Sequence, residues 1–138
     1  MKITVDTNVL ISATFWYGDS FRILERVENK EIELILSHEI IKEYEEVLAY
    51  DEIQEKIQAK QLTMKQTVQK IQTMATLVHP SEKINVITDD PDDNAVLECA
   101  LERKVKYIIT NDKHLLKLKE FREIKIITPS EFHAISHQ

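Results

Sequence analysis

Short apolar runs alternate with longer amphipathic segments along this chain, and this alternation constrains the fold more than any other feature. Five apolar runs have the length and composition of strands, namely residues 2–5, 33–36, 84–87, 106–110 and 124–127. The segments between them carry apolar residues at helical spacing. Strands that alternate with helices favour an α/β domain with a mainly parallel sheet.

Few turn-forming residues interrupt the remaining segments, which favours helix there. The chain contains one glycine and three prolines. We expect helices at residues 8–14, 19–29, 38–48, 51–57, 61–78, 90–101, 113–118 and 129–135. Residues 51–78 are rich in glutamine but keep their apolar spacing. They therefore either cover the sheet or pack on a partner, and the sequence leaves both open.

The size and composition of the chain are those of an ordinary globular protein. With 138 residues, of which 43% are hydrophobic and 30% charged, we expect a single domain over residues 1–138. The only cysteine, Cys99, excludes an internal disulfide framework and a multi-cysteine zinc site, and we expect it to be a small packed residue. The sequence contains neither a secretory signal nor an apolar stretch of the ~20 residues that span a bilayer, so we expect a cytoplasmic protein with no membrane partner.

Acidic residues recur just after three of the apolar runs and on the helix that follows a fourth. They are Asp6, Glu43, Asp90, Asp92, Asp93 and Asp112. The carboxyl ends of parallel strands meet at one edge of a sheet, which is where ligands bind in open α/β folds. We therefore expect several of these carboxylates to lie close together.

Each of these acids also has a purely structural explanation. Asp6 and Asp112 are placed to cap the helices that follow them, and Asp90 is placed to cap a helix with a proline at its first position. Glu43 and Glu45 border the apolar stripe of their helix equally well, so periodicity does not separate a buried acid from a solvated one.

Convergence of the acids would require either protonation or a cation. Two unit charges ~4 Å apart repel by about 4 kcal/mol at an effective dielectric constant near 20. A cluster of four carboxylates is therefore costly unless it is protonated or bridged by a positive ion. Ligands that are all oxygen suit hard ions such as Mg²⁺ or Mn²⁺.

The order and spacing of these segments resemble a known family. The stretches ITVDTNVLISA, LSHEIIKEYEEVL, DPDDNAVLECALERKVKYIITNDKHLL and IITPSEF are similar to the successive motifs of a PIN domain. The nearest branch is that of the toxin components of prokaryotic toxin–antitoxin systems, the VapC-like ribonucleases. The resemblance implies a three-layer α/β/α sandwich with a central, mainly parallel sheet of four to five strands.

The same resemblance implies roles for individual residues. PIN domains are metal-dependent nucleases that act mostly on RNA, and the positions that match their catalytic and metal-binding acids are Asp6, Glu43, Asp93 and Asp112. Together these acids would hold one or two Mg²⁺ or Mn²⁺ ions. Supporting positions are Asn8, Thr110 and Asp92, the last also being the neighbouring alternative to Asp93. The chain departs from the family pattern at Asn111 and at His114, and His114 is therefore a further ligand candidate or an exposed residue.

Positive charge is concentrated late in an otherwise acidic chain. The net charge is −6, yet residues 103–125 contain eight basic residues against three acidic ones. These basic side chains are either solvated helix and strand ends or a rim that binds the phosphates of a nucleic acid. The candidate phosphate-binding residues are Arg103, Lys104, Lys113 and Lys117.

These features favour one function and leave two other classes open. We expect a metal-dependent ribonuclease of the toxin type, with an RNA substrate, an antitoxin protein as partner and a homodimer as a further possibility. The main alternative is a non-catalytic module, stabilised by metal, that binds RNA or a protein partner. A phosphatase with Asp6 as nucleophile is less favoured because Asn8 stands where a phosphatase of this kind has a second aspartate. A phospho-acceptor domain is a related alternative that would need an aspartate at the third strand and a lysine at the fifth.

Overall fold

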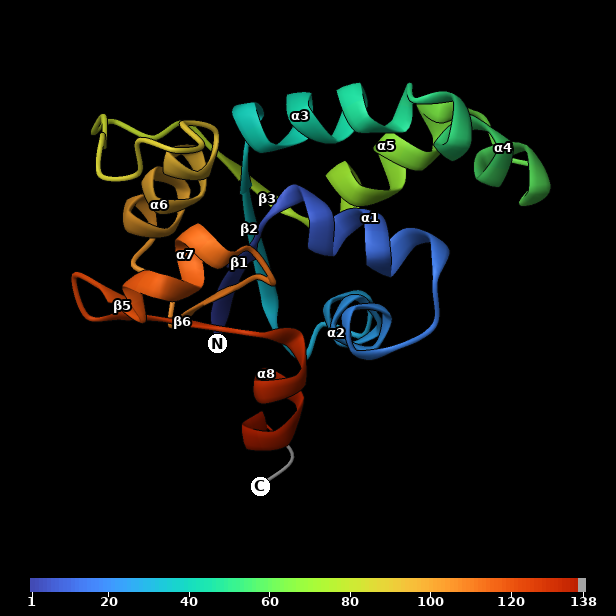
Figure 1. Cartoon of the computed structure of the whole chain (residues 1–138). Helices are drawn as coiled ribbons and strands as arrows, with labels where there is room; N and C mark the ends of the chain where they lie inside the picture. The colour runs from blue at the N-terminus through green and yellow to red at the C-terminus, as the bar shows by residue number, and fades with distance from the viewer. Residues whose placement is uncertain (137–138) are drawn as a thin grey trace.

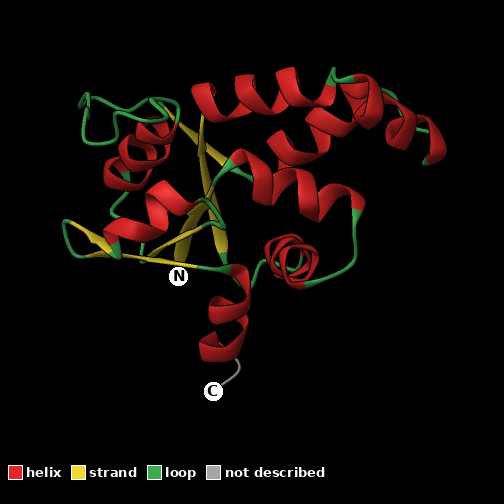
Figure 2. Cartoon of the chain, viewed as in Figure 1, coloured by secondary structure: helices red, strands yellow, loops and turns green. Residues whose placement is uncertain are grey.

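A twisted, mostly parallel sheet forms the centre of the computed structural model, which describes residues 1–136 (Figures 1 and 2). The strands are β1 (Lys2–Val5), β2 (Glu33–Ser37), β3 (Thr76–Val78), β4 (Tyr107–Ile109), β5 (Glu120–Phe121) and β6 (Ile124–Ile127). Their order across the sheet is β3-β2-β1-β4-β6-β5. All neighbouring pairs are parallel except β5 and β6, which form an antiparallel edge.

Helices cover both faces of this sheet. They are α1 (Thr7–Phe15), α2 (Asp19–Glu28), α3 (His38–Leu48), α4 (Asp51–Ala59), α5 (Met64–Met74), α6 (Asp93–Glu102), α7 (Lys113–Leu118) and α8 (Pro129–Ser136). Figure 1 shows α6 on one side of the central strands and α1 with α2 on the other. The α/β fold with a mainly parallel sheet that the sequence predicts is therefore confirmed. No helix within residues 1–136 is both long and apolar enough to cross a lipid bilayer.

Polar side chains start several of the helices. The Asp6 carboxylate accepts from the Val9 amide at the start of α1, and the Ser37 hydroxyl accepts from Ile40 at the start of α3. Such caps satisfy amides that have no partner within the first turn of a helix. Because each capping residue lies at the carboxyl end of a strand, these caps fix the direction in which the chain leaves the sheet.

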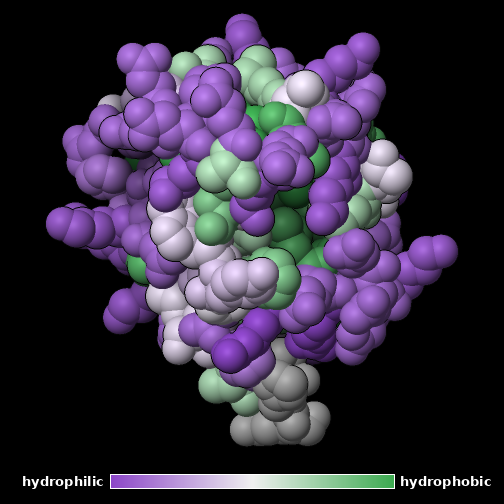
Figure 3. Space-filling model, turned by 90° about the vertical axis from the view of Figure 1, so that its right-hand side faces the viewer, coloured by the Kyte–Doolittle hydropathy of each residue, from purple (hydrophilic) through white to green (hydrophobic). Residues whose placement is uncertain are grey.

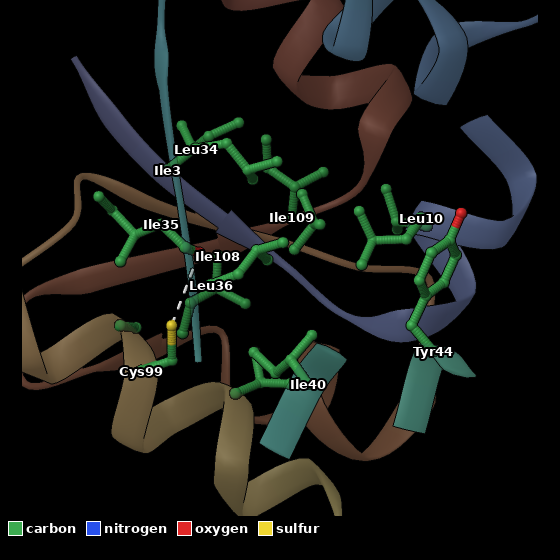
Figure 4. Close-up of a cluster of buried hydrophobic side chains, with 14 of the residues drawn as sticks. Ile3, Leu10, Leu34, Ile35, Leu36, Ile40, Tyr44, Cys99, Ile108 and Ile109 are labelled. Atoms are coloured by element: carbon green, nitrogen blue, oxygen red, sulfur yellow. Dashed lines mark hydrogen bonds between the residues drawn. The ribbon is translucent and has the colours of Figure 1, made fainter. Parts of the chain in front are cut away.

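The core lies between the strands and the helices that flank them (Figure 4). Its fully buried side chains include Ile3, Leu10, Leu34, Ile35, Leu36, Ile108, Ile109, Tyr44 and Cys99. The strands are apolar at successive positions because helices bury both of their faces. The Cys99 thiol lies 3.6 Å from the Ile35 carbonyl oxygen, which agrees with the expected packed cysteine.

The predicted strands differ from the observed ones at three places, and the sheet has six strands rather than the predicted four to five. The predicted helix over residues 61–78 ends at Met74, and β3 follows it and pairs with β2. The two-residue strand β5 was not predicted at all. Residues 84–87, predicted as a strand, have no regular secondary structure. The physical reason for this last difference lies in side-chain contacts with α6, described below.

A hydrophobic hollow opens on the face formed by α1, α2 and α5. Figure 3 shows apolar side chains gathered in the middle of this face and surrounded by hydrophilic ones. The cavity there has a volume of about 160 Å³, and its apolar lining includes Ala13, Phe21, Leu24, Leu62 and Ile71. The helices between residues 51 and 78 thus contribute one wall of a groove as well as packing on the rest of the domain.

Candidate metal centre

Two neighbouring strands bring the first pair of site residues together. Val5 of β1 and Ile109 of β4 are register partners, so Asp6 and Thr110 follow them side by side. Asp6 is 5% exposed, and its Oδ1 accepts from the Val9 amide at 3.0 Å. Its Oδ2 accepts a short hydrogen bond from the Thr110 hydroxyl. Both oxygens of Asp6 are therefore held in a fixed orientation.

Thr110 also connects Asp6 to the next acid along the chain. Its hydroxyl oxygen accepts from the Asp112 amide at 2.9 Å. The Oδ1 atom of Asp112 in turn accepts from the amides of His114 and Leu115, at 2.8 and 3.1 Å, and so caps α7. Thr110, which is fully buried, thus makes hydrogen bonds with two of the predicted acids.

Asp93 reaches the same place from the first residue of α6. It is 7% exposed, and its Oδ2 atom is buried without a hydrogen-bond partner among the described residues. Carboxylate oxygens of Asp90, Asp93 and Asp112 all lie within 4.8 Å of one another. An unpartnered buried carboxylate oxygen is costly, and here it belongs to a group of acids from two separate parts of the chain.

The closeness of these acids changes their protonation. Burial, and then the adjacent carboxylate of Asp112, raises the pKa of Asp93 to about 8. Burial also raises the pKa of Asp6 above its usual range, although its hydrogen bonds to Thr110 and Val9 act in the opposite direction. In the absence of a cation the pocket therefore retains a proton near neutral pH.

Glu43 faces the cluster from α3. Its burial, and then the negative charge of Asp92, raises the pKa of Glu43 to about 7, and the charges of Asp90 and Asp6 act in the same direction. A hydrogen bond with the Thr7 side chain opposes this shift. Glu43 is half-buried whereas Glu45 is exposed. This difference in burial distinguishes Glu43 from Glu45, which the helical pattern leaves equivalent.

The other predicted residues lie at the rim of the pocket or farther away. Asn8 is exposed on the first turn of α1, and Asp92 is exposed at the N-cap position of α6, where its side chain makes no capping bond. His114 is also exposed, and its Nδ1 lies 3.7 Å from a carboxylate oxygen of Asp89 rather than within the cluster.

The candidate phosphate-binding residues form two separate groups, and all of them are exposed. Lys113 and Lys117 lie on α7, which begins directly after Asp112. Arg103 and Lys104 follow the last residue of α6, ten residues after Asp93. At 1.5 Å per helical residue this is a separation of roughly 15 Å from the acids.

Asp90 is the site residue that the sequence assigned differently. The sequence offered it as the N-cap of a helix, but α6 begins at Asp93 with Asp92 at the N-cap position. Residues 90–93 form a turn in which the Asp93 amide donates to the Asp90 carbonyl oxygen at 3.0 Å. This turn leaves the Asp90 side chain free to face Asp93. The sequence signal for this was its place among the acids that follow an apolar run, which did not single it out from Asp92 and Asp93.

The donors in this pocket fit a divalent cation. They are carboxylate oxygens from separate elements, one of them is buried without a partner, and two of the acids have pKa values raised to near neutrality. Mg²⁺ and Mn²⁺ prefer oxygen ligands of this kind. A positive ion there would remove the repulsion between the acids and satisfy the unpartnered oxygen of Asp93.

This chain resembles known proteins in both sequence and fold. The family model described as PIN domain matches residues 2–114. No curated protein matches the sequence significantly. A chain in the crystal structure of VapBC2 from Rickettsia felis, bound to a DNA fragment from its promoter, has a TM-score of 0.63 and 12% sequence identity to this chain. The match covers 93% of this chain and 98% of that one, and at this identity it shows a shared fold.

Proposed function

This chain belongs to the PIN domain family, a family of nucleases, and on that premise we propose that it hydrolyses the phosphodiester bonds of RNA with the help of Mg²⁺ or Mn²⁺. The observation that carries the proposal is the buried, unpartnered Oδ2 of Asp93 within a group of converging carboxylates. A pocket of this kind is suited to a cation and, through the cation, to a phosphate group.

Four acids would hold one or two metal ions in this proposal. They are Asp6, Glu43, Asp93 and Asp112, each from a different element or strand end. When bound, a divalent ion supplies Lewis-acid activation of water and neutralises the charge that develops on the phosphate. Thr110 orients Asp6, and the first amides of α7 orient Asp112.

Basic residues would position the RNA around this pocket. Lys113 and Lys117 lie nearest, on the helix that Asp112 caps, and would bind phosphates that flank the scissile bond. Arg103 and Lys104 lie at the far end of α6 and would contact more distant nucleotides. Such contacts add affinity without sequence preference.

We further propose that the whole chain, residues 1–138, is one PIN domain of the toxin type that acts in the cytoplasm. The likeness to a chain of the VapBC2 structure supports this proposal at the level of the fold. A toxin of this type has an antitoxin protein as its partner, and a homodimer is a further expectation.

A cleavage assay tests the proposal. Purified protein is incubated with labelled single-stranded RNAs in Mg²⁺, in Mn²⁺ and in EDTA, beside an Asp6→Asn variant prepared in the same way. Asparagine is as good a helix cap as aspartate, so this variant keeps the start of α1. We expect cleavage by the wild type that requires metal and is lost in the variant.

Two results would contradict this function. Equal cleavage by both proteins would assign the activity to a contaminant. Stabilisation by metal without cleavage of any RNA would instead favour a non-catalytic module that binds metal.

A further inference from the structure

We propose that Asp90 is an additional ligand of the metal centre, and that Asn94 and Glu98 are positioning residues that hold the segment presenting it. This inference rests on the proposed function, because it assigns residues to the same metal centre. It adds an acid that neither the helical pattern nor the family resemblance assigns, and it gives a role to residues 79–92.

The first observation is the position of the Asp90 carboxylate. It lies within 4.8 Å of carboxylate oxygens of Asp93 and Asp112, whereas Asp6 and Glu43 are not in this closest group. Asp93, which is only 7% exposed and whose Oδ2 has no hydrogen-bond partner among the described residues, belongs to the same cluster. Asp90 is itself partly buried.

Asp90 is therefore placed where a cation held by Asp93 and Asp112 would meet its carboxylate as well.

The second observation concerns how the segment before Asp90 is held. Asn94 accepts from the amides of Val86 and Ile87, at 3.1 and 2.9 Å, and donates to the Ile87 carbonyl oxygen at 2.8 Å. One turn farther along α6, Glu98 accepts from the Ile84 amide at 2.9 Å.

A third residue continues this row of contacts. Glu102 accepts from the amide of Ser81 at 2.8 Å and from its hydroxyl at 3.1 Å. Asn94, Glu98 and Glu102 are spaced four residues apart and therefore share one face of α6. The chain from Ser81 to Ile87 runs antiparallel to α6 along this face, bound by side chains instead of by a neighbouring strand.

These contacts explain why residues 84–87 look like a strand in the sequence. Ile84 and Ile87 are each 6% exposed and pack into the core, so the segment is apolar at both of its ends. Its backbone amides, however, are satisfied by Asn94 and Glu98, which are themselves 5% and 9% exposed. Buried polar side chains of this kind fix a geometry that regular secondary structure would otherwise supply.

Helix α6 therefore contributes to the pocket in two ways. Asp93 is its first residue, and its side chains Asn94 and Glu98 hold the segment that leads to Asp90. The segment makes its last hydrogen bond with Asn94 at Ile87 and reaches Asp90 three residues later. Without the hydrogen bonds to α6, the segment that carries Asp90 would be free to move away from the pocket.

The first experiment measures Mn²⁺ binding by electron paramagnetic resonance, which does not depend on RNA cleavage. Asp90→Asn is compared with Asp89→Asn, which removes the same charge one residue earlier from an acid whose side chain is 77% exposed. We expect Asp90→Asn to weaken Mn²⁺ binding about tenfold or more and Asp89→Asn to change it less than about threefold. If the two variants weaken Mn²⁺ binding equally, Asp90 acts only through its negative charge and is not a ligand, and the proposal is overturned.

The second experiment tests the positioning role with two variants of Glu98. Glutamine keeps an oxygen that accepts from the Ile84 amide, whereas alanine does not. We expect Glu98→Ala to weaken Mn²⁺ binding by several fold while circular dichroism shows it folded, and Glu98→Gln to restore binding to within about twofold of the wild type. If the folded alanine variant binds Mn²⁺ as tightly as the glutamine variant, the segment needs no positioning by α6, and this part of the proposal is wrong.

The wild-type measurement separates this inference from the proposed function. If the wild type itself binds no Mn²⁺, the metal-dependent nuclease is contradicted. If the wild type binds Mn²⁺ and Asp90→Asn binds it equally well, only the role of Asp90 fails.

Discussion

Two of the proposed metal ligands, Asp6 and Asp112, also cap helices with the same carboxylate. Asp6 caps α1 with one oxygen and contacts Thr110 with the other, and Asp112 caps α7 through its Oδ1 atom. The sequence presents capping and metal binding as alternatives for these residues. The two roles are compatible, because each carboxylate oxygen has two lone pairs and one hydrogen bond occupies only one of them.

The protonation of Asp93 and Glu43 gives a pH dependence to the stability of the metal-free protein. Their pKa values in the folded state, about 8 and about 7, lie above the usual values of about 3.9 and 4.3 in an unfolded chain. At pH values between the unfolded and the folded pKa of these groups, the folded protein binds more protons than the unfolded chain. The free energy of unfolding therefore falls as pH rises through this window.

We expect this decline to be shallower in Asp93→Asn, because asparagine does not titrate. Chemical denaturation in EDTA, at several values between about pH 5 and pH 8, measures it for both proteins. Comparison with the variant isolates Asp93 from the other groups that titrate in this range. A decline of the same slope in the two proteins would show that Asp93 has no raised pKa.

At the scale of elements, the sequence predicts most helices and strands because caps and apolar spacing are local signals. The predicted ranges 113–118 and 124–127 agree with α7 and β6. The strand β3 was missed because no glycine or proline separates it from α5, and its pairing with β2 is a non-local contact. Residues 84–87 were mistaken for a strand because their apolar pattern indicates only that the segment is buried. It does not indicate that side chains of α6, and not a neighbouring strand, bind the backbone amides.

The capping box at the start of α5 provides a test of the scaffold apart from the site. The Thr63 hydroxyl accepts from the Gln66 amide, and the Gln66 side chain accepts from the Thr63 amide. Thr63→Ala removes one of these bonds and is expected to cost about 1 kcal/mol. Thermal denaturation should show a melting temperature lower by roughly 2–4 °C.

RNA cleavage by Thr63→Ala should equal that of the wild type at a temperature where both are folded, because none of the acids lies on α5. A loss of cleavage in the folded variant would mean that α5 contributes to the site.

For the whole molecule, the convergence of the acids follows from the topology of the sheet. Parallel strands place their carboxyl ends at one edge, so Asp6 and Asp112 could be predicted to meet once β1 and β4 were recognised as parallel. The approach of Glu43 and Asp93 depends on how α3 and α6 pack, which no local pattern determines. The sequence places Glu43, Asp90 and Asp93 among the candidate acids, and the family resemblance selects Glu43 and Asp93. Only the structure shows Asp90 in the closest group.

The distribution of positive charge on the surface leads to a prediction about RNA binding. Lys113 and Lys117 lie near the acids, whereas Arg103 and Lys104 lie at the other end of α6. We expect Lys113→Ala/Lys117→Ala to raise KM for a short RNA several fold with little change in kcat. The slope of log affinity against log salt concentration should become shallower by about 0.7 for each phosphate that a lysine no longer neutralises.

Arg103→Ala/Lys104→Ala is the matched control, since it removes the same charge at a distance from the pocket. Its effect on a short RNA should be smaller. If the two double variants raise KM equally, the lysines of α7 act only through the total charge of the protein.

The claim that this acidic pocket performs RNA cleavage is tested most directly by two adjacent aspartates. Asp93 is buried in the cluster, and Asp92 is exposed at the N-cap position. Single-turnover cleavage of one labelled RNA in Mn²⁺ is measured for Asp93→Asn and Asp92→Asn side by side. We expect Asp93→Asn to be slower than the wild type by about 100-fold or more and Asp92→Asn by less than about fivefold. Equal rates for the two variants would show that cleavage does not come from this pocket.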